Sequence, residues 1–194
     1  MTRHAAIKRQ TRETRIILEL KLDGTHQVEV ATGIGFLDHL LSALAYHAGW
    51  DLALECHGDL EVDDHHTAED CALALGSAVD QALGDRSGIA RFGWAFAPLD
   101  ESLARSVVDL SGRPWPAIEL GLERERLGEL ACENISHVLQ SFAIAARCAL
   151  HVDVLRGAND HHRAESAFKA TALALRQACA RSDGGVPSTK GVLV

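Results

Sequence analysis

The chain has 194 residues, of which 47% are hydrophobic, and its formal net charge at pH 7 is -8. This length and apolar content suffice for one domain or two small halves with a buried core, and the negative charge disfavours a general nucleic-acid surface. The N-terminus lacks the apolar stretch of a signal peptide, and no run approaches a membrane span of roughly 20 apolar residues. The five cysteines include no Cys-x-x-Cys pair and indicate small buried side chains in a reducing compartment, so a cytoplasmic protein without a membrane partner is expected.

The first half of the chain mixes strand and helix patterns. Apolar and polar residues alternate over 15–22, as in a half-buried strand, and Asp23-Gly24 predicts a hairpin turn into a second strand over 26–31. The elements expected after it are a helix near 37–47, a strand over 51–56, and a helix that Asp63 or Asp64 caps and that ends near residue 83, before Gly84.

The second half repeats this kind of order. Strands are expected near 92–97, 103–110 and 115–121, a helix from Asn134 to about 147, a strand around 150–154, and a helix from Asn159, its N-cap, to about 181. The tail over 186–191 has no periodicity and is interpreted as an ordered loop or an arm.

Two segments of the chain match each other. His39 and the apolar pattern behind it align with His137, and Asp64 to Glu69 aligns with Asp160 to Glu165 at nearly the same separation. The sequence therefore predicts an internal duplication, with halves over about 1–90 and 91–194 that form one compact unit. The expected class is α+β, each half being a β-sheet with two helices on one face.

The duplicated histidines suggest a metal site. On a helix, His65 and Glu69 are four residues apart and share one face, whereas His66 is rotated by roughly 100°. The second copy supplies an equivalent set, and one histidine upstream of each copy can complete it. The candidate metal ligands are His39, His65, His66, Glu69, His137, His161, His162 and Glu165.

Imidazole and carboxylate ligands without thiolate suit Mn, Fe, Co, Ni or Zn rather than Mg or Ca. The alternative is that each His-His pair lines a helix start whose acidic residues only complement the helix dipole. Two aligned His-His-x-x-Glu copies with matched upstream histidines favour the metal site.

Other polar residues are candidates for binding an anion. A guanidinium at a strand end, such as Arg91 or Arg113, can meet a phosphate with a fork of donors, and Lys169 points toward the same side of its helix as the ligands. Each of these could equally be a surface residue, as could the tail residues Ser188, Thr189 and Lys190. Spacing identifies no partner for Glu13 or His47.

These motifs resemble the imidazoleglycerol-phosphate dehydratase family over essentially the whole chain. The matching segments are Val62 to Glu69, Gly157 to Lys169, Gly33 to His39, Pro98 to Glu101, Asp109 to Pro114 and Pro187 to Gly191. The resemblance implies a fold related to the ribosomal S5 domain 2-like group, a homo-oligomer of 24 subunits with metal sites at the subunit interfaces, and a monofunctional chain.

The resemblance also implies site roles, with two Mn²⁺ ions per active site. One ion is expected on His39, His66, His161 and Glu165, and the other on His65, Glu69, His137 and His162. Substrate contacts are expected at Glu13, His39, His47, His65, Glu69, Arg91, Arg113, His161, Lys169, Ser188, Thr189 and Lys190. The catalytic carboxylates are expected to be Glu13, Glu69 and Glu165, with Glu13 the candidate proton shuttle because it is not committed to a metal.

The reaction that the resemblance implies is dehydration of imidazoleglycerol phosphate to imidazole acetol phosphate in histidine biosynthesis. The hydrogen that departs is not next to a carbonyl, so another electron sink is required, and an imidazolate of the substrate stabilised by two metal ions can supply it. A non-catalytic metal-binding shell and another two-metal hydrolase of a phosphorylated metabolite are the alternatives. Neither accounts as well for an imidazole-rich site with lysines beside it.

Overall fold

The structure is a computed structural model that describes residues 3–191 and residue 193. Its first half contains β1 (His4–Gln10), β2 (Thr14–Lys21), β3 (Val28–Ala31), α1 (Gly35–Ala48), β4 (Asp51–Gly58) and α2 (His65–Leu83). Its second half contains β5 (Phe92–Leu99), β6 (Ser102–Asp109), β7 (Trp115–Glu119), β8 (Arg126–Leu127), β9 (Leu130–Ala131), α3 (Cys132–Ala145), β10 (Ala149–Arg156) and α4 (Asp160–Ala178).

The two halves have the same sheet topology. The first sheet has the strand order β1-β2-β4-β3 and the second has β5-β6-β10-β7. In each sheet the first three strands pair antiparallel and the last pairs parallel to its neighbour. The α+β class and the two similar halves predicted from the sequence are therefore confirmed.

The predicted hairpin at Asp23-Gly24 is wrong, because β2 and β3 are not neighbours. Strand β3 pairs parallel with β4, and β2 lies between β1 and β4. The Asp51 carboxylate accepts backbone N–H groups of Thr25 (2.6 Å) and Gln27 (3.0 Å), and a Cβ at Gly24 would lie 2.2 Å from the Asp51 nitrogen. The segment after β2 is thus a tight crossing over the start of β4. The antiparallel hairpin partner of β2 is β1, a strand that was not expected from the sequence.

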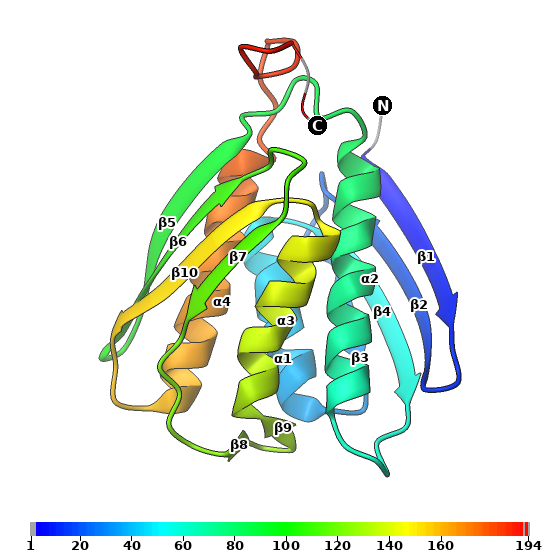
Figure 1. The fold of residues 1–194 in the computed structure, drawn as a ribbon, viewed down its shortest axis with the longest axis vertical. Helices are drawn as coiled ribbons and strands as arrows, with labels where there is room; N and C mark the ends of the chain where they lie inside the picture. Colours follow the sequence, from blue (N-terminus) through cyan, green and yellow to red (C-terminus); the bar gives the residue numbers. More distant parts are fainter. Residues whose placement is uncertain (1–2, 192, 194) are drawn as a thin grey trace.

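The four helices form a double layer between the two sheets (Figure 1). Helices α1 and α2 cover the first sheet and α3 and α4 the second, while α1 packs against α4 and α2 against α3. Alternate residues of each inner strand, such as Ile16, Leu18 and Leu20 of β2, are buried against the helices. One core therefore spans both halves, as expected for elements that each have a single apolar face.

The helix ends are close to those predicted. The Asn159 side chain accepts the backbone N–H of His161 (2.9 Å), which confirms it as the N-cap of α4. At α2 the Asp63 carboxylate accepts the backbone N–H of His65 (2.8 Å), whereas Asp64, at the N-cap position, makes no side-chain cap. Helix α3 begins at Cys132 rather than Asn134, and α4 ends at Ala178 rather than near 181.

The described part of the tail forms no regular helix or strand, only turns such as that from Gly191 N–H to the Ser188 carbonyl (3.0 Å). Within the described chain, no helix combines the length and the apolar character that crossing a membrane requires.

Candidate metal centre

All four helices begin at the same end of the molecule, the lower end in Figure 1. His65 and His161 lie in the first turns of α2 and α4, and His39 and His137 in the second turns of α1 and α3. Because α1 contacts α4 and α2 contacts α3, these starts are brought together in pairs. Each pair can gather side chains from two distant parts of the sequence.

The first cluster consists of His39 of α1 with His161 and Glu165 of α4. One carboxylate oxygen of Glu165 lies 3.1 Å from His39 Nε2 and 3.2 Å from His161 Nε2. One potential ligand atom from each residue lies within 4.8 Å of the others. This spacing is short enough for a single ion to bind all three.

The second cluster consists of His65 and Glu69 of α2 with His137 of α3. Glu69 Oε1 lies 3.1 Å from His137 Nε2, and the rings of His65 and His137 stack with centroids 5.0 Å apart. These three donors also lie within 4.8 Å of one another. Each cluster therefore combines a histidine of one half with the histidine and glutamate of the other half.

The Glu165 carboxylate is held in its charged form. Burial alone would raise its pKa, but hydrogen bonds from Lys169 and His39 outweigh burial and lower the pKa to about 2. Lys169 Nζ lies 2.6 Å from Oε1, while Oε2 faces the two imidazoles. Lys169 is thus next to the first cluster. Burial is the main cause that lowers the pKa of the nearby His47 imidazole, and the positive charge of Lys169 is the second.

The two remaining predicted ligands, His66 and His162, lie outside the clusters. His66 Nδ1 contacts the Asp59 carboxylate (3.0 Å), and its Nε2 lies 3.7 Å from Glu13 Oε1. His162 Nδ1 contacts Glu101 Oε2 at 2.7 Å. These carboxylate contacts raise the pKa of both imidazoles. Within one chain the structure therefore brings six of the eight predicted ligands together in two groups of three.

Asn134 is a site residue that the sequence analysis treated only as the start of a helix. Its Nδ2 donates to Asp64 Oδ2 (3.0 Å), which turns its Oδ1 toward His65 Nδ1 (2.9 Å). Asn134 must accept there, so His65 carries its proton on Nδ1 and presents an unprotonated Nε2. The only signal in the sequence was an asparagine three residues before His137, and its partners Asp64 and His65 are distant in the chain.

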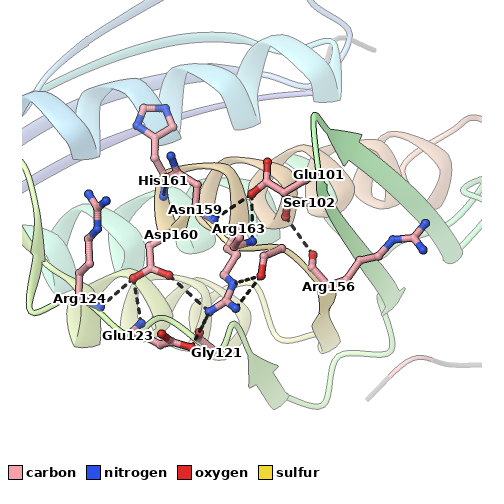
Figure 2. A network of polar contacts seen from close by, with 12 residues as sticks. Glu101, Ser102, Gly121, Glu123, Arg124, Arg156, Asn159, Asp160, His161 and Arg163 are labelled. Atoms are coloured by element: carbon pink, nitrogen blue, oxygen red, sulfur yellow. Dashed lines mark hydrogen bonds and ion pairs between the residues drawn. The ribbon is translucent and has the colours of Figure 1, made fainter.

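The start of α4 is fixed by a network around its first residues (Figure 2). Asp160 Oδ2 accepts the backbone N–H groups of Glu123 (2.9 Å) and Arg124 (2.7 Å). Arg163 donates to the carbonyls of Gly157 (3.0 and 2.7 Å) and Gly121. These contacts tie the loop between β7 and β8 to the helix that carries His161 and Glu165.

The predicted phosphate-binding residues other than Lys169 lie at the other end of the molecule. Arg91 and Arg113 precede β5 and β7, which start at the upper end in Figure 1, and the tail with Ser188 to Lys190 lies there too. Arg91 is held by two bonds to Asp109 (2.7 and 3.0 Å) and donates to the Pro187 carbonyl (2.8 Å). Helices of 19 residues separate the two ends, which is roughly 28 Å.

Two imidazoles and one carboxylate per cluster, without a thiolate, form a donor set that fits a borderline transition metal ion, and three ligands leave positions for others. A duplicated α+β fold with two such clusters defines a candidate two-metal enzyme.

Comparisons with known proteins identify the family. The family model for imidazoleglycerol-phosphate dehydratase matches residues 32–175. Relatives of that name include one from Scheffersomyces stipitis, 53% identical with 100% of both chains covered, and one from Saccharomyces cerevisiae, 52% identical with 98% of each covered. The crystal structure of imidazoleglycerol-phosphate dehydratase from Staphylococcus aureus superposes with a TM-score of 0.84 at 32% identity, covering 92% of this chain and 99% of that one. The chain belongs to the imidazoleglycerol-phosphate dehydratase family, metal-dependent hydro-lyases of histidine biosynthesis.

Proposed function

We propose that this chain dehydrates imidazoleglycerol phosphate to imidazole acetol phosphate and water in histidine biosynthesis. The observation that carries the proposal is the pair of equivalent His-His-Glu clusters, each built from both halves of the fold. Family membership supplies the reaction, and the clusters supply the donors that such a reaction needs.

The proposed cofactor is Mn²⁺, two ions per active site. His39, His161 and Glu165 would hold one ion, and His65, Glu69 and His137 the other. When bound, the ions supply positive charge that stabilises negative charge developing on the substrate ring. His66 and His162 belong to neither group of their own chain, and we assign them as the fourth ligands, supplied to the clusters of neighbouring chains.

Three carboxylates have different proposed roles. Glu69 and Glu165 each contact an imidazole of their cluster, so they are committed to ligand binding. Glu13 lies in the turn between β1 and β2, half exposed, with an oxygen 3.7 Å from His66 Nε2. This position at the rim of the metal end suits a group that takes a proton from the substrate chain and returns it.

The active site is proposed to form between chains. Arg91, Arg113 and the tail lie about one helix length from the clusters of their own chain, too far for one small substrate to reach both. They would hold the phosphate of a substrate whose ring lies at a neighbour's clusters.

The outer face of the second sheet favours assembly. Phe92, Trp94 and Phe96 alternate along β5 with more than half of each side chain exposed, and Trp115 of β7 is 67% exposed. An apolar sheet face of this kind is typical of a protein interface. A homo-oligomer, of 24 subunits by the family resemblance, would cover it.

The proposed location is the cytoplasm. All five cysteines are free and buried, as expected in a reducing compartment, and burial raises the pKa of the Cys148 and Cys179 thiols to about 12.

The test is an assay of purified protein for the product ketone after removal of metal with a chelator and again after addition of Mn²⁺. Stripped protein should be inactive and should recover with Mn²⁺, and light scattering should show a large oligomer. His65→Asn and His161→Asn should lower both metal content and rate, whereas His57→Asn, at an exposed histidine paired only with Glu55 in the described structure, should change neither. Full activity in metal-free protein, or in a monomer of 20.9 kDa, would refute the proposal.

A further inference from the structure

Two glutamates occupy equivalent places in the two halves but have different surroundings. Glu13 immediately precedes β2, and Glu101 immediately precedes β6, the strand at the same position of the second sheet. Both lie at the metal end, beside the second histidine of a His-His pair. Glu13 approaches His66 Nε2 at 3.7 Å, whereas Glu101 bonds His162 Nδ1 at 2.7 Å.

Glu101 is anchored by the backbone. Its Oε1 accepts the N–H groups of Ala158 (3.0 Å) and Asn159 (2.8 Å), just before α4, and the Asn159 contact is visible in Figure 2. Two donors on one oxygen leave the other oxygen, Oε2, for His162. A carboxylate only accepts, so the His162 ring must donate from Nδ1.

This contact determines which nitrogen of His162 can bind a metal. A neutral imidazole with its proton on Nδ1 has its lone pair on Nε2. Nε2 points away from Glu101, and its nearest charged group is the exposed Asp100 at 3.8 Å. We propose that Glu101 is a positioning residue that locks His162 in the tautomer whose Nε2 binds metal, leaving proton transfer to its counterpart Glu13. This inference rests on the proposed function, because it assigns His162 as a ligand.

His66 provides a matched comparison within the same chain. Both oxygens of Asp59 lie near His66 Nδ1, at 3.0 and 3.2 Å, and the described residues give the Asp59 carboxylate no backbone donor. An asparagine at this position can therefore turn its amide oxygen to the ring N–H and keep the tautomer. A glutamine at position 101 cannot do so, because its oxygen is needed by the two backbone N–H groups.

The isosteric changes Glu101→Gln and Asp59→Asn should consequently differ. In Glu101→Gln the amide NH₂ faces His162 Nδ1 and can only donate, which moves the ring proton to Nε2 and blocks the ligand atom. Loss of the hydrogen-bond partner of a metal-binding histidine typically weakens metal binding by about 10- to 100-fold. We expect Glu101→Gln to bind one ion per chain with wild-type affinity and the other ion with an affinity lower by that factor. Asp59→Asn should bind both ions with close to wild-type affinity.

The experiment measures Mn²⁺ stoichiometry and affinity of the full chain by competition with a chelator, with thermal unfolding as the check on folding. If Glu101 only anchors the backbone before α4, Glu101→Gln should bind Mn²⁺ like the wild type, because its amide oxygen still accepts the N–H groups of Ala158 and Asn159. Only Glu101→Ala should then bind Mn²⁺ more weakly. Unchanged binding in a folded Glu101→Gln, or equal losses in Glu101→Gln and Asp59→Asn, would therefore overturn the inference while the proposed function stands.

Two further measurements keep the test decisive. If Glu101 acts through His162, Glu101→Gln should cause no additional loss of Mn²⁺ affinity in a His162→Asn background, and an additive loss would overturn the inference. Nitrogen NMR of labelled histidine in metal-free protein should place the His162 proton on Nδ1 in wild type and on Nε2 in Glu101→Gln. Wild-type protein that binds no Mn²⁺ would refute the proposed function together with this inference, an outcome distinct from a failure of Glu101 alone.

Discussion

Gly76 sets the distance between the two helices that carry the second cluster. A Cβ at this position of α2 would lie 2.5 Å from the Phe142 carbonyl oxygen, 2.8 Å from Ala145 Cβ and 2.9 Å from the Ala146 nitrogen of α3 and its end. Ordinary contact needs about 1 Å more, and the neighbouring atoms are mostly backbone, so the helices have to move apart. Gly76→Ala should therefore destabilise the fold.

The size of the effect follows from two opposing contributions. Overpacking a close helix contact costs about 1–3 kcal/mol, and replacing glycine by alanine inside a helix returns about 1 kcal/mol. Because two of the three nearest atoms are backbone, the overpacking cost lies in the upper part of its range, at about 2–3 kcal/mol. The net loss in the free energy of unfolding is therefore about 1–2 kcal/mol, or a Tm lower by about 2–8 °C for a chain of this length. Because His137 moves with α3, binding at the second cluster should weaken while the first cluster keeps its affinity.

The assay is thermal unfolding followed by circular dichroism, in the presence of chelator so that metal binding does not add to stability. Gly35→Ala is the matched control, because Gly35 also lies in a helix and a Cβ there meets nothing within 4 Å. The control should not lower the Tm. A Gly76→Ala protein with wild-type Tm and two wild-type metal sites would show that the contact between α2 and α3 is not as close as the structure indicates.

Three further predictions concern pH dependence and catalysis. Hydrogen bonds from Arg3, opposed by burial, and from Arg181 lower the Asp23 pKa from 3.8 to about 2, so this carboxylate stabilises the fold above its unfolded pKa and loses that effect as pH falls from about 4 to 2. In acid unfolding, the free energy of unfolding of Asp23→Asn should lack about 1 kcal/mol of that pH dependence, after discounting for the exposure of the side chain. An acid-unfolding profile identical to that of the wild type would contradict this prediction. Glu13→Gln should lower kcat by about 10²–10⁴-fold with Mn²⁺ content intact, and a wild-type kcat would exclude Glu13 as the shuttle. Lys190→Ala should mainly raise KM, because a phosphate contact that is equal in ground and transition states does not change kcat; a lower kcat at unchanged KM would argue against this role.

Local spacing was enough to predict part of the metal end. His65 with Glu69 and His161 with Glu165 are one helical turn apart, and the structure keeps each pair in one cluster because helix geometry depends only on neighbouring residues. The assignment of His39 to the pair on α4 came from the family resemblance alone. It depends on α1 packing against α4, a contact between residues far apart in the chain.

The strand β1 was missed for a different reason. It is an edge strand whose only buried hydrophobic residue is Ala5, with Ile7 partly buried, so its alternation is hidden among charged residues. The order of β3 and β4 was equally inaccessible, since the turn residues Asp23 and Gly24 fit a hairpin as well as a crossing. Hydrogen bonds from Thr25 and Gln27 to Asp51, which exist only in the folded chain, decide between them.

The exchange of ligands between halves bears on how the chain is divided. Residues 1–90 contain His39 but neither His161 nor Glu165, and residues 91–194 contain His137 but neither His65 nor Glu69, so neither of the two clusters lies within one half. The helices that carry these residues also bury their apolar faces against the other half. We therefore propose that the boundary near residue 90 separates two copies of a structural pattern within one folding unit. An arrangement in which each half completes the other's cluster ties metal binding to correct docking of the two halves, because neither cluster can form until α1 packs against α4 and α2 against α3.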